Sequence, residues 1–113
     1  MPYISTTTTV TMDEKKREAI KTKLGKAIEL IGKSENFLML SFKDNAYMYF
    51  KGSNEKPLAF VEVKLLGKAS KEVYSNLTKE ITNILNEELQ IQPDCVYVKY
   101  EEVEHWGWNG TNF

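Results

Sequence analysis

The chain carries a strand–helix–strand pattern twice, and this repeat restricts its fold more than any other feature. Residues 2–8 and 37–42 are rich in strand-forming side chains and flank a first amphipathic helix, while residues 58–66 and 96–100 flank a second. The two patterns start roughly 55–60 residues apart, and each is long enough to form a right-handed βαβ unit. We therefore predict an α/β (α+β) fold, in which two βαβ units form a four-stranded mixed sheet with two helices on one face.

The helices are marked by their start signals and by one apolar stripe each. Thr11-Met-Asp-Glu14 predicts a capping box for the first helix, which Gly32 ends, and Ser70 predicts the N-cap of the second. The apolar stripes have helical spacing and comprise Ile20, Leu24, Ala27, Ile28 and Ile31 in the first helix, and Val73, Leu77, Ile81, Ile84 and Leu85 in the second.

The sheet face that the helices leave uncovered predicts an oligomer. Between the two units, a turn at residues 43–46 and a short strand at residues 47–50 predict a hairpin. We expect the uncovered face to present apolar residues such as Ile4, Met39 and Val98. A single domain of 113 residues with such a face is expected to bury it in a symmetric assembly.

Composition excludes several functional classes. The net charge of −1 and the absence of a basic stripe argue against nucleic-acid partners and against charge-driven membrane binding. No apolar run approaches the length of a membrane span and no charged-then-apolar leader precedes the chain, so a cytoplasmic location is expected. Cys95 and His105 are the only residues of their kinds, which argues against a disulfide framework, a metal site and a Ser–His or Cys–His catalytic pair. We expect no cofactor.

Pro2 directly follows Met1, and small second residues permit removal of the initiator. Pro2 would then carry a free secondary amine, and a neutral amine near pH 7 can take a proton from a carbon next to a carbonyl. The alternative interpretation is structural, because proline is well tolerated as the first residue of a strand. The dipeptide by itself leaves both interpretations open.

Further short motifs follow Met1-Pro2 in a fixed order along the chain. They are Gly32-Lys33, Phe50, Gly52-Ser53, Leu66-Gly67-Lys68, Val96-Tyr97-Val98 and the tail Trp106-Gly-Trp-Asn-Gly-Thr-Asn-Phe113. With these motifs the chain resembles the macrophage migration inhibitory factor family of the tautomerase superfamily over essentially its whole length. The resemblance implies two βαβ units and a homotrimer whose sheets face inward around a central axis.

The resemblance also implies an active site at each subunit interface. Pro2 would be the general base of keto–enol tautomerisation, and the substrates would be phenylpyruvate-type α-keto acids and dopachrome-like compounds. Lys33 matches the lysine that binds the substrate carboxylate, and Leu66 matches the position whose backbone amide faces the substrate. Tyr97 matches a tyrosine contributed by the neighbouring subunit, and two aromatic residues match the mouth of the pocket, namely Trp108 and Phe113.

Each of these residues also has a purely structural interpretation. Lys33 suits the end of a helix, where a cation interacts favourably with the helix dipole. Tyr97 could be a core aromatic of its strand, and Trp108 and Phe113 could seal the tail against the sheet, a role compatible with lining the pocket.

The chain departs from the family pattern at several positions near the implied pocket. Lys99 stands where the mammalian cytokine has Asn, which predicts a second cation in the pocket. Trp106 replaces a Val and enlarges the apolar wall, whereas Phe37 replaces a Tyr and loses a hydroxyl. Asn112 stands where Thr is usual. The CxxC pair of the mammalian protein is absent, so thiol-oxidoreductase activity is not expected.

Two other functions are left open by the residues. The family includes cytokines, so the chain could be a receptor ligand with a vestigial pocket, secreted without a signal peptide. It could also be an intracellular protein that uses the trimer as a scaffold. Pro2 and Lys33 support the enzyme hypothesis at the level of individual residues.

Overall fold

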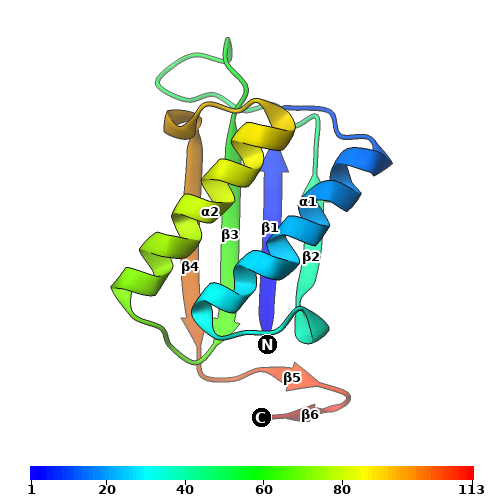
Figure 1. Ribbon diagram of the computed structural model, residues 1–113, viewed down its shortest axis with the longest axis vertical. Coiled ribbons are helices and arrows are strands. Elements are labelled where there is room, and N and C mark those ends of the chain that lie inside the picture. The colour runs from blue at the N-terminus through cyan, green and yellow to red at the C-terminus, as the bar shows by residue number, and fades with distance from the viewer.

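A computed structural model describes residues 1–113 as one four-stranded sheet with two helices packed against one of its faces (Figure 1). The main elements in chain order are β1 (Pro2–Thr8), α1 (Glu14–Ala27), β2 (Met39–Lys43), β3 (Ala59–Leu66), α2 (Lys71–Leu89) and β4 (Val96–Val103). The short elements are η1 (Ile28–Ile31), η2 (Glu35–Phe37), η3 (Pro93–Cys95) and a tail hairpin of β5 (Gly107–Trp108) and β6 (Thr111–Asn112).

The strands are ordered β2-β1-β3-β4 across the sheet. Strand β1 pairs in parallel with β2, and β3 pairs in parallel with β4. The two βαβ units meet at the central antiparallel pair of β1 and β3. The predicted α/β fold with its mixed sheet and its two helices on one face is thus confirmed.

Helix boundaries follow local capping chemistry, with one correction. The predicted capping box at Thr11 is wrong, because Asp13 is the N-cap of α1 and its carboxylate accepts a hydrogen bond from the backbone amide of Lys16 at 2.8 Å. An aspartate nearer the first turn provides an anionic acceptor for the unpaired helix amides. The N-cap at Ser70 is confirmed, and Gly32 ends η1 in the left-handed conformation at φ 75°.

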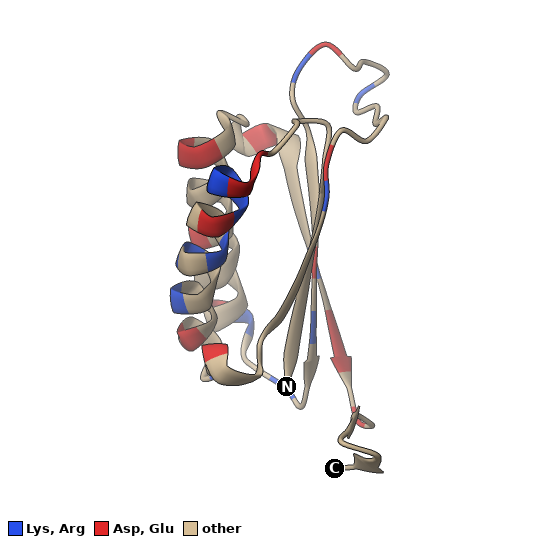
Figure 2. Cartoon of the chain, turned by 90° about the vertical axis from the view of Figure 1, so that its right-hand side faces the viewer, with Lys and Arg blue, Asp and Glu red and all other residues tan.

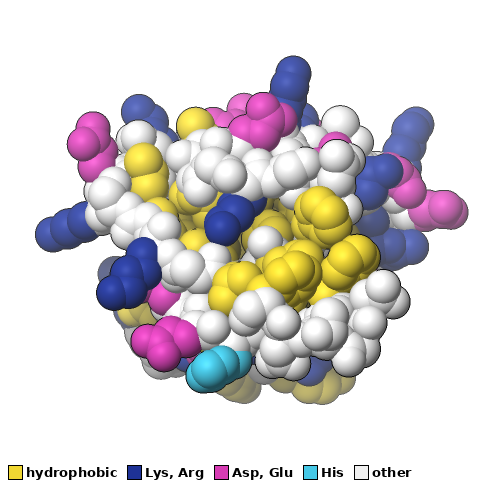
Figure 3. Space-filling view, turned by 90° about the horizontal axis from the view of Figure 1, so that it is seen from below, with side chains coloured by type: hydrophobic (Ala, Val, Ile, Leu, Met, Phe, Trp, Pro, Cys, Tyr) yellow, Lys and Arg dark blue, Asp and Glu magenta, His cyan; other side chains and the backbone are white.

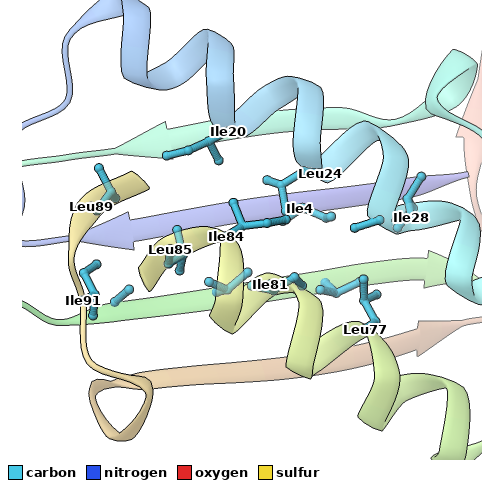
Figure 4. Packing of buried hydrophobic residues seen from close by; sticks show 14 of the residues in the cluster. Ile4, Ile20, Leu24, Ile28, Leu77, Ile81, Ile84, Leu85, Leu89 and Ile91 are labelled. Carbon is cyan, nitrogen blue, oxygen red and sulfur yellow. The ribbon is translucent and has the colours of Figure 1, made fainter. Parts of the chain in front are cut away.

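The core lies between the helix layer and the sheet (Figure 4). It is a cluster of 19 buried residues, and the predicted stripes of both helices supply much of it. Strand β3 alternates strictly between buried and half-buried positions, so each second side chain points to the helices. Lysines and acidic residues occur along the helices and also along strands of the sheet (Figure 2). Neither α1 nor α2 combines the length and the apolar character that crossing a bilayer requires.

The open face of the sheet mixes polar side chains with aromatic and aliphatic ones, which contradicts the prediction of an apolar face. Ile4 is fully buried beneath the helices, and Val98 packs against the core opposite the buried Val61. Of the three residues expected on the open face, only Met39 is strongly exposed. The strand alternation was correct, but a period of two does not by itself say which face is covered.

A further error concerns residues 47–50, which form no strand within the chain. They belong to a loop that projects beyond the sheet at the end where β1 finishes (Figure 1). Tyr47 is fully exposed, and the segment ends in a tight turn in which the backbones of Phe50 and Ser53 exchange two hydrogen bonds of 2.9 and 3.0 Å. No strand of the same chain lies beside residues 47–49, so their strand-forming side chains have no ladder to join.

Candidate functional site

The start of β1 lies at one end of the sheet, beside the tail hairpin. Pro2 is buried there and lies opposite Leu65 of β3. An open hollow of about 840 Å³ surrounds this end of the chain and is lined by residues 1–3, 36–39 and 105–108. Viewed from this end, hydrophobic side chains gather on the surface of the molecule (Figure 3). The volume is in the range of about 300–1,000 Å³ that small-molecule sites occupy.

The amino end of the chain lies in an environment that disfavours a positive charge. Partial burial, followed by the nearby Lys33 ammonium, lowers the pKa of the Met1 amino group from its ordinary value. The Lys33 side chain reaches this end because Gly32 reverses the chain after η1, and its Nζ donates to the Leu66 carbonyl oxygen at 3.1 Å. An amine and a fixed cation therefore lie near one another.

The backbone amide of Leu66 also faces the amino end. Its N–H donates to the carbonyl oxygen of Met1 at 3.2 Å, just beyond the β1–β3 ladder. Removal of Met1 would take this acceptor away and leave the Leu66 amide directed at the space next to Pro2. Base, cation and hydrogen-bond donor would then surround one small volume.

Aromatic side chains form a wall between η2 and the tail. The rings of Phe37 and Trp108 meet edge to face with centroids 5.7 Å apart, and Trp108 stacks on Phe113 at 6.2 Å. All three remain about half exposed, and Trp106 is half-buried beside them. The Phe113 amide donates to the Trp106 carbonyl at 3.1 Å, which ties the last residue of the chain to the start of the tail hairpin. Asn112 lies opposite Gly107 in this hairpin.

Two of the predicted site residues lie far from this group within one chain. Pro2 lies level with Leu65, which in turn lies opposite Glu102 of β4. Tyr97 is five residues further along β4, a separation of about 16 Å along the strand, and Lys99 is three residues away. Tyr97 and Lys99 could therefore complete the hollow only from another copy of the chain.

Tyr97 and Lys99 differ in how far contacts within their own chain occupy their side chains. Tyr97 packs edge to face against Phe50 at 5.1 Å and remains more than half exposed. Lys99 instead forms an ion pair with Glu101, with 3.0 Å between Nζ and Oε1. The hydrogen bond to this carboxylate raises the pKa of Lys99 and lowers the pKa of Glu101. The charge of Lys99 is thus largely balanced by its own strand.

His105 lines the hollow, although it was not among the predicted site residues. The tail lies near Pro2 because β4 ends at this end of the sheet, where Val103 lies opposite Leu66. After Trp108, Asn109 and Gly110 adopt left-handed conformations, with φ of 55° and 80°, in the turn that pairs β5 with β6. An Asn-Gly pair between short strands is a strong hairpin signal, and it could have predicted the tail hairpin. Asn36 and Met39 also line the hollow without having been predicted.

Comparisons with known proteins identify relatives over the whole chain. The family model described as macrophage migration inhibitory factor (MIF) matches residues 1–113. The mouse (Mus musculus) macrophage migration inhibitory factor is 30% identical over 84 residues, which cover 73% of this chain and 72% of that protein. The structure of Leishmania major MIF2 is similar with a TM-score of 0.94 and 33% identity, and the match covers 100% of this chain and 97% of that one. A homologue from Prochlorococcus marinus gives a TM-score of 0.89 at 28% identity, with 98% of each chain covered.

Proposed function

The chain belongs to the macrophage migration inhibitory factor family, and on this premise we propose that it is a keto–enol tautomerase with Pro2 as its general base. The substrates are phenylpyruvate-type α-keto acids and dopachrome-like compounds. The observation that carries the proposal is the position of the amino end of the chain, which lies beside Lys33 and the Leu66 amide at the open hollow.

The reaction requires a base that is neutral at working pH. An α-amino group has an ordinary pKa of about 7.7–8.0. Burial and the Lys33 ammonium lower the pKa of the terminal amine at this place, and we infer the same direction for Pro2 once Met1 is gone. The neutral nitrogen of Pro2 then takes a proton from the carbon next to the substrate carbonyl. The C–H electron pair forms the C=C bond, the carbonyl π electrons move onto oxygen, and the oxygen recovers a proton from the prolinium to give the enol.

Two fixed groups bind the polar end of the substrate in this proposal. The Lys33 ammonium pairs with the carboxylate, and its bond to the Leu66 carbonyl holds it in place. The Leu66 amide donates to the substrate oxygen on which negative charge develops, the position that the Met1 carbonyl occupies in the unprocessed chain. The aromatic wall of Phe37, Trp106 and Trp108 receives the ring.

We expect Lys33→Gln to impair substrate binding and also to change the pH profile. Loss of the carboxylate partner should raise KM several-fold, with a smaller effect on kcat. Because a cation near the amine disfavours its protonated form, its removal should raise the amine pKa and move the acid limb of kcat/KM to higher pH. The measurement is a pH–rate profile with phenylpyruvate. Lys68→Gln, which removes an exposed lysine outside the hollow, is the matched control. An unchanged KM and inflection in Lys33→Gln would contradict its role.

The site is completed by other copies of the chain in a homotrimer. This is supported by the distance of Tyr97 from Pro2 in one chain, and by the strong exposure of Tyr47, Tyr49 and Tyr97, whose rings are expected to be covered on assembly. The open sheet face is expected to line the interior around the axis. Sedimentation equilibrium at micromolar concentration should give about three times the mass of the 13.1 kDa chain. A stable monomer under these conditions would reject the assembly.

The direct test of the function is an assay of the mature protein with phenylpyruvate. Intact mass first establishes that Met1 has been removed. The rate of enol formation should then exceed the rate in buffer alone, and it should be inhibited by non-reactive aryl carboxylates that compete for Lys33. A processed trimer without tautomerase activity toward any aryl α-keto acid would refute the proposal.

A further inference from the structure

The loop between β3 and α2 is held by an acidic side chain that the proposed chemistry does not use. Glu102 lies near the end of β4, and its Oε2 accepts a hydrogen bond from the backbone amide of Ala69 at 3.2 Å. The same oxygen accepts a hydrogen bond from the hydroxyl of Tyr74, in the first turn of α2, at 2.6 Å. One carboxylate oxygen therefore joins β4 both to this loop and to α2.

The two donors keep the carboxylate of Glu102 in its charged form, although the residue is exposed. The hydrogen bonds from Tyr74 and from the Ala69 amide lower the pKa of Glu102 from its ordinary value. Burial, and then the Glu102 carboxylate, raise the pKa of Tyr74 to about 12, so its hydroxyl remains a donor. The distance of 2.6 Å is typical of a charge-assisted hydrogen bond, which is roughly twice as strong as a neutral one.

The held loop directly follows the peptide unit that binds Lys33. The Leu66 carbonyl oxygen accepts a hydrogen bond from Lys33 Nζ at 3.1 Å. The N–H of the same peptide unit belongs to Gly67 and donates to the Val103 carbonyl oxygen at 3.1 Å. Because the unit is planar, its C=O and N–H point in opposite directions, and a tilt of the plane weakens both bonds. The orientation of this plane therefore decides where the Lys33 ammonium is held.

Gly67 makes this orientation depend on the residues that follow. Its φ of 96° lies in the region that favours glycine, and without a Cβ the residue can leave this conformation at little steric cost. The Ala69 amide, two residues later, is bound to Glu102. We propose that Glu102 is a positioning residue for Lys33, because its bond to Ala69 keeps Gly67 in this conformation. The inference rests on the proposed function and adds to it a residue outside the hollow.

The first experiment follows the backbone and needs no turnover. Amide hydrogen exchange of Gly67 and Ala69, resolved by NMR, should become about 2–10-fold faster in Glu102→Ala, as expected for the loss of one hydrogen bond. Glu102→Gln keeps an oxygen that can accept, so its exchange rates should stay close to those of the parent protein. Glu104→Ala removes the same charge two residues further along the chain and is the matched control. An unchanged Gly67 rate in Glu102→Ala would overturn the proposal.

The second experiment tests whether the effect reaches the site through Lys33. The affinity for 3-phenylpropanoate, a non-reactive aryl carboxylate, should fall about 2–10-fold in Glu102→Ala, and Glu102→Gln should restore most of it. Tyr74→Phe, which removes one donor and keeps the ring, should lose part of the affinity. In a Lys33→Gln background Glu102→Ala should have no further effect, since both changes act on one contact. An equal loss of affinity in both backgrounds would show a purely structural role and refute the proposal.

The two experiments also separate this inference from the proposed function. Faster exchange at Gly67 and a Lys33-dependent loss of affinity, in a protein whose processed form has no tautomerase activity, would refute the enzyme proposal and leave the role of Glu102 standing. Turnover of phenylpyruvate by the parent protein, with neither exchange nor affinity altered in Glu102→Ala, would refute only the role of Glu102. A parent protein that binds no aryl carboxylate would refute both.

Discussion

Phenylpyruvate turnover should fall about 10²–10⁴-fold when Pro2 is replaced by glycine, which is the loss expected for a missing general base. In the mature chain the pyrrolidine ring would fix the direction of the amine at the start of β1. Glycine keeps an amine, but it is primary and mobile, so it loses both the secondary nitrogen and its fixed orientation. Steady-state kinetics on the processed protein, with intact mass to verify that Met1 is absent, measure the effect.

A form that retains Met1 provides an independent version of the same test. In that form the Pro2 nitrogen is an amide, and the Met1 carbonyl occupies the Leu66 N–H at 3.2 Å. Base and oxyanion donor are then both lost without a change in any side chain, so the loss of turnover should equal or exceed that of Pro2→Gly. Unfolding midpoints that match the processed protein would show that the fold is intact. Activity of the Met1 form close to that of the processed form would reject Pro2 as the base.

The largest expected effect on stability comes from the centre of the helix–sheet interface. Ile81 of α2 is 1% exposed and lies within the core cluster. Ile81→Ala should lower the free energy of unfolding by about 2–5 kcal/mol, the range for truncating a large buried aliphatic side chain. Leu30→Ala is the matched control, because Leu30 is 45% exposed and leaves little cavity. Its cost should stay below about 1 kcal/mol.

Denaturant titrations at one fixed protein concentration measure both variants, since unfolding of an oligomer depends on concentration. Equal losses for Ile81→Ala and Leu30→Ala would contradict the assignment of the core. The comparison also separates an effect on stability from an effect on catalysis. Ile81 does not line the hollow, so the folded fraction of the variant should retain its KM.

Local patterns in the sequence were sufficient for the architecture. The apolar stripes of α1 and α2 are spaced for a helix, and the strands on either side are short and apolar, so two βαβ units followed directly. These signals concern neighbours within about two helical turns, where the chain's own geometry fixes which side chains share a face. The N-cap was misplaced by two residues for the same local reason, because Thr11 and Asp13 are both good caps.

The candidate site was predictable only in part. The motif around Pro2 and Lys33 was found through family resemblance, whereas His105 was not among the predicted site residues. Its place at the hollow depends on where β4 ends, because Val103 lies opposite Leu66 at the end of the sheet where β1 starts, and residues 105–108 follow directly. A contact between residues a hundred positions apart leaves no periodic trace in the sequence.

The sequence by itself determined the βαβ repeats, the helix faces and the chemistry available at Pro2 and Lys33. The tertiary structure alone decided which sheet face stays open, that residues 47–50 lack a partner strand, and that the tail closes one side of the hollow. The physical reason is the distance along the chain over which residues interact. The spacing of side chains that are close in sequence determines the type of each element and which of its side chains share a face. Which faces meet depends on the antiparallel pairing of β1 with β3, which joins distant parts of the chain.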